Sequence, residues 1–250
     1  MNDHQAIFES GILINAFECD FLGRWKPAAY FQHLSETAGR HAEQLGVGFE
    51  MMVAQNLFWV HSRMKIKFFG SPMAGDTITI RTWPKTIQQK LFYIRDFEVL
   101  DANGDLLAAA SSAWLVINAS TRRIVTPQTI NLDLPALNDR NALDEPLDRL
   151  GLSQTGEEKL RVTASYSSVD PLGHVNNSRY VDWICDVFPM DDYRKHSLDW
   201  MQVNYDREIR PSEEVALLAK RSGEDPELWM VEGVNRTNNQ RSFEAALHWR

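Results

Sequence analysis

Apolar residues recur at helical spacing over the segment that follows Pro27. They are three or four positions apart, the period of a helix with one buried face, and they are Ala28, Phe31, Leu34, Ala38, Ala42 and Leu45. Pro27 is favourable in the first turn of a helix, and Gly46 at the position just past its end. The pattern therefore predicts one long helix over residues 27–45.

A period of two replaces this pattern further along the chain. Basic and apolar residues alternate as in a strand with one exposed face: Arg63, Met64, Lys65, Ile66, Lys67 and Phe68. Further strands are predicted over 77–82, 91–100 and 106–118, and Asn103-Gly104 is a strong hairpin signal between the last two. The first half reads as a helix followed by an antiparallel sheet.

The second half repeats this order of elements. Tyr180, Ile184 and Val187 have helical spacing over a shorter helix, which we expect Pro189 to end. The strands predicted after this helix cover 200–209, 215–220, 228–235 and 242–250. Between the halves, residues 127–159 contain three prolines and many acidic residues without a sustained period, so they read as an irregular linker.

A short sequence repeat relates the two halves. Asp20-Phe-Leu-Gly-Arg24, with Tyr30 six residues on, matches Asp170-Pro-Leu-Gly-His174 with Tyr180, so four identities share one offset of 150 positions. Such internal similarity is typical of duplicated structural units. We therefore predict an α+β protein with two long helices, each wrapped by an antiparallel sheet.

This architecture places the domain boundaries in the linker. We expect an N-terminal domain over 1–127, a linker over 128–160 and a C-terminal domain over 161–250. The alternative is one larger α+β domain without internal symmetry. Two domains in one chain already form a complete unit, so a monomer and a homodimer are both compatible with the pattern.

Composition restricts the class of protein. The 250 residues are 44% hydrophobic and 24% charged, a normal soluble composition, and no run approaches the about 20 apolar residues of a membrane span. A net charge of −8 argues against a general nucleic-acid binder, which is usually basic. We see no secretory or transit signal, and Cys19 and Cys185 are too few for a disulfide framework. We expect a cytoplasmic protein in which Cys185 is a buried packing residue.

Several chemistries have no motif in this sequence. There is no Gly-x-Ser-x-Gly elbow, no phosphate-binding P-loop, and no His-Glu-x-x-His or Cys-x-x-Cys zinc pattern. His33 and His41 lie on the first predicted helix, where we expect surface or hydrogen-bonded residues rather than metal ligands. The sequence therefore predicts neither a cofactor nor a metal.

One cluster of reactive side chains remains, at the entry to the second predicted helix. It consists of Asp170, His174, Asn176 and Asn177. Asn at a helix N-terminus caps backbone amides and Asp stabilises turns, which explains part of the cluster structurally. The cluster also suits thioester hydrolysis, because a thiolate with a pKa of about 8.5 leaves without strong acid assistance. Hydrolysis then needs only an activated water and a site for the oxyanion. A carboxylate or a His can activate the water, and backbone amides at a helix N-terminus can bind the oxyanion.

The stretch from Asp170 to Trp183, D-P-L-G-H-V-N-N-S-R-Y-V-D-W, resembles the signature of the fatty acyl-acyl-carrier-protein thioesterases. Arg95-Asp96-Phe97 and the stretch 114–123 are similar to the first-half signature of that family. Tyr205-Asp-Arg-Glu208 is similar to the segment that contributes a catalytic Glu. The resemblance implies a tandem hot-dog fold and hydrolysis of fatty acyl-acyl-carrier protein to free fatty acid and holo-acyl-carrier protein.

The resemblance implies that Asp170, His174 and Glu208 are the catalytic set. Glu208 would be the general base for water or would orient that base, and His174 would position water or substrate and could shuttle a proton. Asp170 would orient His174 or act as a nucleophile. The sequence departs from the family at Leu172, where the family has Asn, and at Ile209, where plant members have a Cys. A mechanism through cysteine is therefore disfavoured.

Substrate contacts are implied in both halves. Gly173, Asn176 and Asn177 belong to the matched motif, and we expect them to bind substrate. Arg24 stands in the first copy at the place of His174, so we expect the N-terminal domain to bind the acyl chain rather than cleave it. The candidate tunnel walls, which core packing explains equally well, are Trp25, Phe31 and Phe58.

The implied partner is an acidic acyl-carrier protein with a phosphopantetheine-linked acyl chain. The candidate docking charges, for which ordinary solvated strand faces are the alternative, are Arg122, Arg123, Lys65 and Lys67, with Arg63, Lys85 and Lys90 as further ones. Three other classes stay open. They are a hydrolase of acyl-CoA, a non-catalytic acyl-thioester binder and a hydratase on the same fold.

Overall fold

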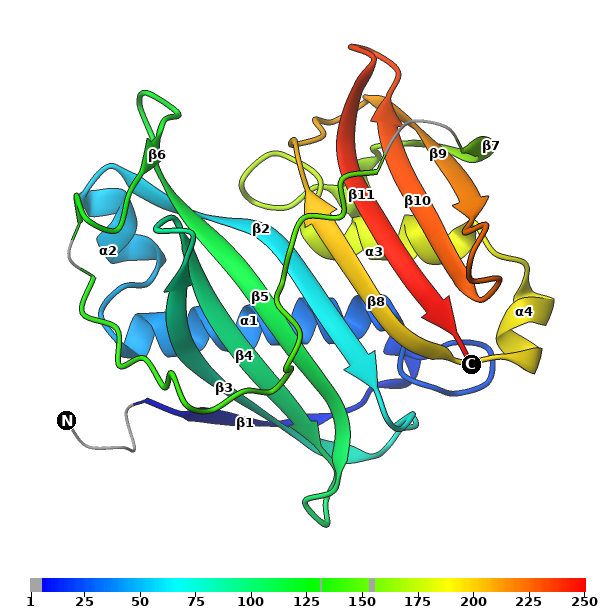
Figure 1. The fold of residues 1–250 in the computed structure, drawn as a ribbon, viewed down its shortest axis with the longest axis horizontal. Coiled ribbons are helices and arrows are strands. Elements are labelled where there is room, and N and C mark those ends of the chain that lie inside the picture. Colours follow the sequence, from blue (N-terminus) through cyan, green and yellow to red (C-terminus); the bar gives the residue numbers. More distant parts are fainter. Residues whose placement is uncertain (1–5, 131, 153–155) are drawn as a thin grey trace. The chain divides into compact units, whose positions relative to one another are not determined.

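The computed structural model of the chain describes residues 6–130, 132–152 and 156–250 (Figure 1). It divides into two compact units. The first comprises residues up to Trp25 and 33–147, and the second comprises 26–32 and 148–250. Among the described residues, no helix is long and apolar enough to cross a membrane.

The first unit contains an antiparallel sheet with the strand order β1-β3-β4-β5-β2, and β6 pairs with β5. Its strands are β1 (Phe8–Leu13), β2 (Leu57–Phe68), β3 (Thr77–Gln88), β4 (Phe92–Leu100), β5 (Leu106–Asn118) and β6 (Ile124–Val125). The predicted β4–β5 hairpin is confirmed, with Gly104 at φ +89°, a left-handed conformation that glycine adopts without strain. Strand β1 was not predicted.

The predicted long helix is α1 (Pro27–Gln44), and its apolar stripe is buried, with Leu34 fully so. It ends as expected at Gly46, which has φ +69° and donates its N–H to the carbonyl of Glu43 at 3.0 Å. A six-residue helix, α2 (Phe49–Ala54), follows, which is too short to show a period in the sequence.

The second unit has the same construction. Its antiparallel sheet has the order β8-β11-β10-β9-β7. Its elements are β7 (Glu157–Thr163), α3 (Asn177–Asp186), α4 (Met190–Lys195), β8 (Leu198–Tyr205), β9 (Glu214–Arg221), β10 (Leu228–Asn235) and β11 (Gln240–Trp249). Figure 1 shows α3 behind this sheet, and Tyr180 of α3 stacks on Phe243 of β11 with ring centroids 5.1 Å apart.

The helix of the second unit is the shorter of the two, as the spacing of its apolar residues predicted. Helix α3 has 10 residues, whereas α1 has 18. The chain leaves α3 after Asp186, three residues before Pro189, which lacks the N–H that a continued helix needs. Pro189 instead precedes α4 as its N-cap residue.

The linker is irregular, as predicted, but it packs against the first sheet. The Trp83 indole donates to the carbonyl of Arg140 at 3.2 Å, and the Asp96 carboxylate accepts from the amide of Ala142 at 2.9 Å. Arg63 donates to the carbonyl of Leu147 at 3.1 Å and is only 6% exposed. The expected exposed face of this strand is therefore wrong at Arg63, because the linker covers it.

Candidate active site

A tight loop presents His174 at the entry to α3. The amide of Asp170 donates to the carbonyl of His174, and the amide of Gly173 donates to the carbonyl of Asp170, both at 3.0 Å. Gly173 has φ +83°, so a side chain at this position would be strained. Val169 and Val175 bridge across the base of the loop. Gly173 therefore shapes the loop rather than contributing a polar group.

The structure brings the three predicted catalytic side chains together. Nδ1 of His174 lies 3.9 Å from Oδ1 of Asp170, and Nε2 lies 3.9 Å from Oε1 of Glu208. The side chains of Asp170, His174 and Glu208 are 16%, 26% and 45% exposed. The imidazole is thus flanked by two carboxylates, each facing one ring nitrogen. Separations of this size are longer than hydrogen bonds, and such contacts often shorten when substrate binds.

Glu208 lies in a loop, not on the strand predicted over 200–209. Strand β8 ends at Tyr205, and the amides of Asp206 and Arg207 both donate hydrogen bonds to the carbonyl of Ser242, at 2.8 and 3.0 Å. Ile209 is fully buried, and its carbonyl accepts from the amide of Val175 at 2.8 Å. This bond ties the Glu208 loop to the His174 loop and explains how Glu208 reaches the site.

Asn176 has the structural role that its type suggests. Its side-chain oxygen caps α3 by accepting from the amide of Ser178 at 3.0 Å and from the Ser178 hydroxyl at 2.8 Å. Asn177 is the first residue of α3, where a backbone amide has no intrahelical acceptor. The amide of His174 also has no acceptor among the described residues. Two N–H groups are therefore available at the positive end of α3.

The first copy of the repeat has the same loop with different chemistry. The amides of Asp20 and Gly23 close it as in the second copy, at 2.8 and 2.9 Å, and Gly23 has φ +80°. Arg24 replaces His174, and its Nε and Nη2 both lie 2.9 Å from one carboxylate oxygen of Asp20. The first copy thus contains a closed ion pair where the second has a histidine between two carboxylates.

The two copies also correspond in the loop that carries Glu208. The amide of Trp25 donates to the carbonyl of Pro72 at 2.9 Å, as that of Val175 donates to Ile209. Pro72 therefore corresponds to Ile209, and Ser71 to Glu208. Sequence comparison missed this pair because its offset is 137 positions, not 150.

The remaining candidates, from the motif and from the expected acyl-chain walls, differ in how exposed they are. Leu172, which replaces the family Asn, is 58% exposed, while Trp25 and Phe31 are buried. Phe58 is partly buried and packs against Phe49, with ring centroids 6.1 Å apart. Burial raises the pKa of the Cys185 thiol to about 12, so this cysteine is unreactive at neutral pH.

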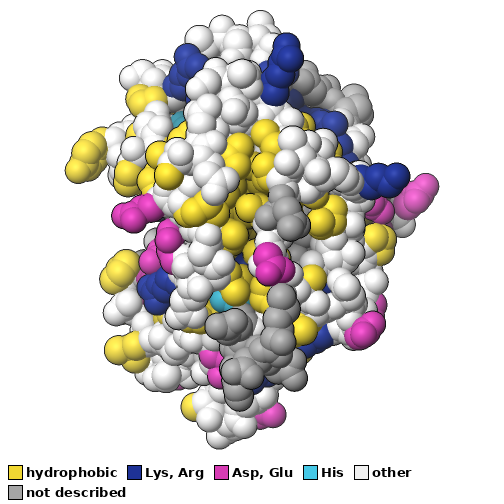
Figure 2. Space-filling view, turned by 90° about the vertical axis from the view of Figure 1, so that its left-hand side faces the viewer, with side chains coloured by type: hydrophobic (Ala, Val, Ile, Leu, Met, Phe, Trp, Pro, Cys, Tyr) yellow, Lys and Arg dark blue, Asp and Glu magenta, His cyan; other side chains and the backbone are white. Residues whose placement is uncertain are grey.

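The docking candidates fall into two groups. Arg122 and Arg123 are exposed in the turn between β5 and β6, and Lys90 is exposed in the turn before β4. Lys67 forms an ion pair with Glu145, whose charge also acts on Lys65, and Lys85 lies 3.3 Å from Asp96. Figure 2 shows a face on which hydrophobic side chains gather across the middle, with lysines and arginines towards the upper edge.

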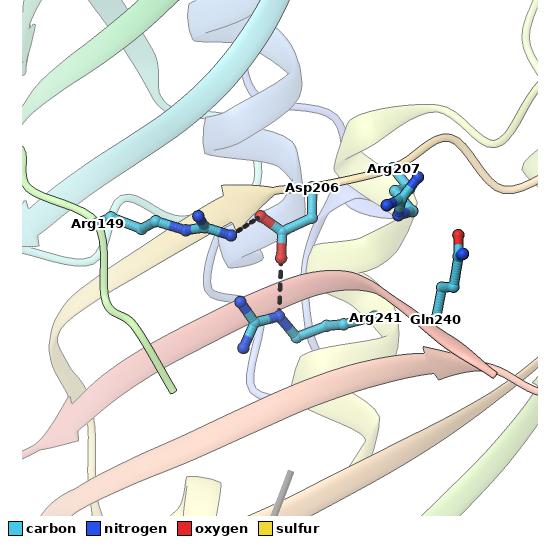
Figure 3. Close-up of a pocket in the computed structure, with 5 residues that line it drawn as sticks. All are labelled: Arg149, Asp206, Arg207, Gln240 and Arg241. Carbon is cyan, nitrogen blue, oxygen red and sulfur yellow. Dashed lines mark hydrogen bonds and ion pairs between the residues drawn. The ribbon is translucent and has the colours of Figure 1, made fainter. Parts of the chain in front are cut away.

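Sequence reasoning missed a polar pocket of about 340 Å³ in the second unit (Figure 3). It is lined by Arg149, Asp206, Arg207, Gln240 and Arg241. Arg241 is the centre of an ion network and lies within 3.0 Å of three carboxylates, those of Asp206, Glu232 and Glu244. Asp206, Glu232 and Glu244 come from three separate segments of the chain, so no single local motif could reveal the network. A charged lining does not suit an acyl chain.

The histidines of α1 are hydrogen-bonded as expected. Nε2 of His33 lies 2.6 Å from Glu18, and Nδ1 of buried His41 lies 2.9 Å from the Arg95 guanidinium. Over the part of the chain that the structure describes, no group of three His, Cys, Asp or Glu side chains is arranged to hold a metal ion.

Two units, each with a helix against an antiparallel sheet, define a tandem hot-dog protein, and the Asp170, His174 and Glu208 cluster lies in the second unit. The sequence matches the family Acyl-ACP thioesterase N-terminal domain over residues 5–130 and Acyl-ACP thioesterase C-terminal domain over residues 152–250. The chain belongs to the acyl-acyl-carrier-protein thioesterase family.

Solved structures agree with this assignment. An acyl-ACP thioesterase from Bacteroides thetaiotaomicron superposes with a TM-score of 0.90 at 25% identity, and the match covers all of both chains. The 12:0-ACP thioesterase from Umbellularia californica shares the fold, with a TM-score of 0.82 at 23% identity over 98% of this chain and 97% of that one.

Similar curated proteins include plant enzymes. The palmitoyl-acyl carrier protein thioesterase of Arabidopsis thaliana is 29% identical over 219 residues, which cover 81% of this chain and 52% of the relative. The oleoyl-acyl carrier protein thioesterase of Coriandrum sativum is 27% identical over 230 residues, covering 81% and 59%. The chain therefore spans little more than half the length of these relatives.

Proposed function

We propose that this protein hydrolyses fatty acyl-acyl-carrier protein to free fatty acid and holo-acyl-carrier protein, in the cytoplasm. The observation that carries the proposal is the position of His174 between Asp170 and Glu208 in the half that retains the family motif. The first half has an Arg24–Asp20 ion pair at the matching place and has no titrating base there. One reactive site per chain follows.

Glu208 is the general base in this proposal. It is the more exposed of the two carboxylates and faces Nε2 of His174, where a water can be held between base and thioester. Asp170 is the orienting group. Its Oδ1 accepts a hydrogen bond from the Leu172 amide at 2.9 Å. In the first copy, Oδ1 of Asp20 accepts the same bond from the Leu22 amide at 2.8 Å. Because both copies have this bond, the loop-shaping role of Asp170 is independent of the reaction.

The reaction then needs little acid assistance. Glu208 removes a proton from water as the oxygen attacks the thioester carbonyl, and the carbonyl oxygen becomes an oxyanion. The amides of His174 and Asn177, at the N-terminal end of α3, can donate to this oxyanion. Collapse of the intermediate breaks the C–S bond, and the thiolate takes up the proton that Glu208 removed from water, passed on through His174, which returns both groups to their starting state.

The N-terminal domain expected over residues 1–127 provides the acyl-binding half. We propose Trp25, Phe31 and Phe58 as wall residues that contact the acyl chain. Phe58 is the most informative of them because it is only partly buried, so its truncation leaves the core intact. In an assay over acyl chains of increasing length, Phe58→Ala should shift the preferred length. An unchanged profile would remove Phe58 from the acyl site.

Release of free thiol from purified acyl-acyl-carrier protein tests the proposed function. We expect His174→Ala and Glu208→Gln to lower kcat by about 100-fold or more, the usual contribution of acid–base groups. Asp170→Asn keeps an oxygen for the Leu172 amide and should lower kcat with little loss of stability. Ser71→Ala, at the matching place in the first copy, is the control and should retain full activity.

The carrier-bound and CoA-bound forms of one acyl chain separate the proposed substrate from the nearest alternative. The proposal requires a higher kcat/KM on the carrier-bound form. Equal or higher values on acyl-CoA would make the protein an acyl-CoA hydrolase. Wild-type activity that survives both Glu208→Gln and His174→Ala would contradict the assigned site.

A further inference from the structure

Arg95 of β4 is a buried cation that forms no ion pair in the part of the chain that the structure describes. It is 8% exposed, and its Nη1 donates to Nδ1 of His41 at 2.9 Å and to the Thr82 hydroxyl at 3.3 Å. A guanidinium has no acceptor, so Nδ1 of His41 accepts this bond and carries no proton. Both partners are therefore neutral. A buried charge without a counter-ion is destabilising, so Arg95 points to a role other than stability.

The guanidinium of Arg95 is open along its Nε–Nη2 edge. Nη1 carries two N–H groups, and the bonds to His41 and Thr82 account for both. The N–H groups of Nε and Nη2 have no acceptor among the described residues. This edge presents two parallel N–H groups, the arrangement that binds both oxygens of a carboxylate. Arg95 thus lacks one bidentate anion.

The neighbouring carboxylate does not supply that anion. Asp96 follows Arg95 in β4, and successive side chains of a strand point to opposite faces of the sheet. On its own face, Asp96 accepts through Oδ2 from Lys85 at 3.3 Å and from the Ala142 amide at 2.9 Å. The charge of Asp96 is therefore directed at Lys85 and the linker.

The face of the sheet around Arg95 combines apolar side chains with one further open polar group. Ser112 of β5 stands opposite Arg95, and Met64 of β2 continues the same row. Phe97, two residues on, and Met64 are fully buried. Tyr93, two residues back, has a buried hydroxyl with no hydrogen-bond partner among the described residues. A cation and a hydroxyl among apolar side chains suit an aliphatic ligand with one anionic head.

A second buried arginine on the same sheet provides a comparison. The register of β2 shifts between His61 and Arg63, a bulge that places Arg63 opposite Ala113 and so on the other face from Arg95. Arg63 is as buried as Arg95, at 6% exposed. It donates to the carbonyl of Leu147 at 3.1 Å, and its guanidinium lies 4.3 Å from the centre of the Phe92 ring. Arg63 thus has a structural role in holding the linker.

We propose that Arg95 anchors the head group of a long-chain carboxylate in the first unit, with its Nε–Nη2 edge on the two carboxylate oxygens. The Tyr93 hydroxyl is a further donor on the same face. One guanidinium matches a monoanion, and the apolar neighbours Met64 and Phe97 match an aliphatic chain. A free fatty acid, the product of the proposed reaction, belongs to this class. The inference goes beyond the proposed function, because a carboxylate binds here without turnover.

Calorimetric titration with dodecanoate, below the concentration at which it forms micelles, tests the inference on the purified chain. We expect Arg95→Met to bind dodecanoate at least about tenfold more weakly than the wild type, the usual effect of losing a charge-assisted hydrogen bond. Tyr93→Phe should weaken binding about threefold, since it removes a neutral donor. Dodecanol has the same chain without the charge and should bind the wild type at least about tenfold more weakly than dodecanoate.

Arg63→Met is the matched control. It removes an equally buried arginine from the other face and should leave the affinity for dodecanoate unchanged. The two variants should also differ in stability, measured as the urea concentration at the unfolding midpoint. Arg63→Met loses the bond to Leu147 and should unfold at a lower concentration. Arg95→Met removes a buried charge that has no counter-ion, so we expect little or no decrease.

Three results would overturn the inference. The first is a wild-type protein that binds no dodecanoate or binds dodecanol equally well. The second is an unchanged affinity in Arg95→Met. The third is an Arg95→Met protein that is destabilised as much as Arg63→Met or does not fold, because Arg95 would then have its partners already. Calorimetry detects binding without turnover, so a protein that releases no thiol would contradict the proposed function and leave this test intact.

Discussion

His61 shows how burial alone changes the chemistry of a residue. Its side chain is 6% exposed, and its ring stacks on Trp114 with centroids 4.2 Å apart and nearly parallel planes. Burial lowers the pKa of His61 to about 3, because a charged imidazole cannot be solvated there. The folded protein thus holds this histidine neutral over the whole physiological range of pH.

This pKa predicts a pH dependence of stability. The unfolded chain binds a proton at His61 near the ordinary pKa of about 6.5, whereas the folded chain binds it only near 3. Stability is therefore lost as pH falls between these values, by at most about 1.4 kcal/mol per pH unit from this residue. Urea unfolding at pH 7 to 4 should show a shallower slope for His61→Phe, which keeps the stacked ring. An identical slope would contradict a neutral His61.

At the same scale, the positions of Asp170, His174 and Glu208 illustrate what sequence could predict. His174 and Asp170 lie four residues apart in one motif, so their proximity follows from the loop. Glu208 was named from a family resemblance, and the sequence placed it wrongly on a strand. Its position depends on the Val175–Ile209 hydrogen bond, which joins loops distant in the sequence and leaves no local pattern.

The N-terminus of α3 allows a prediction at the scale of the element. Asn176 caps this helix through two hydrogen bonds to Ser178. Asn176→Ala should lower the free energy of unfolding by about 1 kcal/mol, the usual cost of a lost cap, and Asn176→Asp should restore most of it. Asn177→Ala removes no cap and serves as the control in chemical denaturation. Equal losses at 176 and 177 would contradict the assigned cap.

The ion network between β8, β10, β11 and the linker allows a second prediction at the scale of the element. Glu232 and Glu244 are buried, and both depend on Arg241 for their charge balance. Arg241→Ala removes the ion pair of buried Glu232 and the closer of the two ion pairs of buried Glu244, and should cost about 3 kcal/mol or more of stability. Arg149 contacts two of the same carboxylates but is 62% exposed, so Arg149→Ala should cost less than about 1 kcal/mol. The urea concentrations at the unfolding midpoints of Arg241→Ala and Arg149→Ala compare these effects. Similar decreases in the two variants would contradict a central role for Arg241.

Elements with strong local signals were predicted well. The apolar stripe of α1, its Gly46 end and the Asn103-Gly104 hairpin match the structure closely, because each depends on neighbouring residues. The exposed face of β2 was predicted wrongly at Arg63, since exposure depends on which distant segment covers a strand. Strands β1 and β7 were missed because their edge positions need few buried residues, as the half-exposed pattern of β1 shows.

At the scale of the whole molecule, net charge bears on the proposed docking of an acyl-carrier protein. The chain has a net charge of −8 and would repel an acidic carrier protein except where cations are exposed. We propose Arg122 and Arg123 as the main docking charges. Lys65 and Lys67 are weaker candidates because Glu145 already engages them.

Docking through these arginines predicts a salt-dependent rate. As NaCl rises and the Debye length falls below about 10 Å, kcat/KM on acyl-acyl-carrier protein should decrease. The decrease should be smaller for Arg122→Ala and Arg123→Ala, and unchanged for Lys67→Ala. An uncharged small acyl thioester is the substrate control and should show no salt effect. A wild-type rate that is insensitive to salt would contradict electrostatic docking.

The two loops that begin with Asp20 and Asp170 keep one backbone and carry different side chains. Because the loop closes through main-chain hydrogen bonds and one left-handed glycine, it folds regardless of what stands at its fifth position. Under the proposed function, one half can therefore lack the reactive side chain without any penalty in foldability. The stability of the loop is thus independent of the reactive side chain that it carries. Under the proposed function, the residues of the second loop would be copied into the first by three substitutions: Arg24→His, Ser71→Glu and Pro72→Ile.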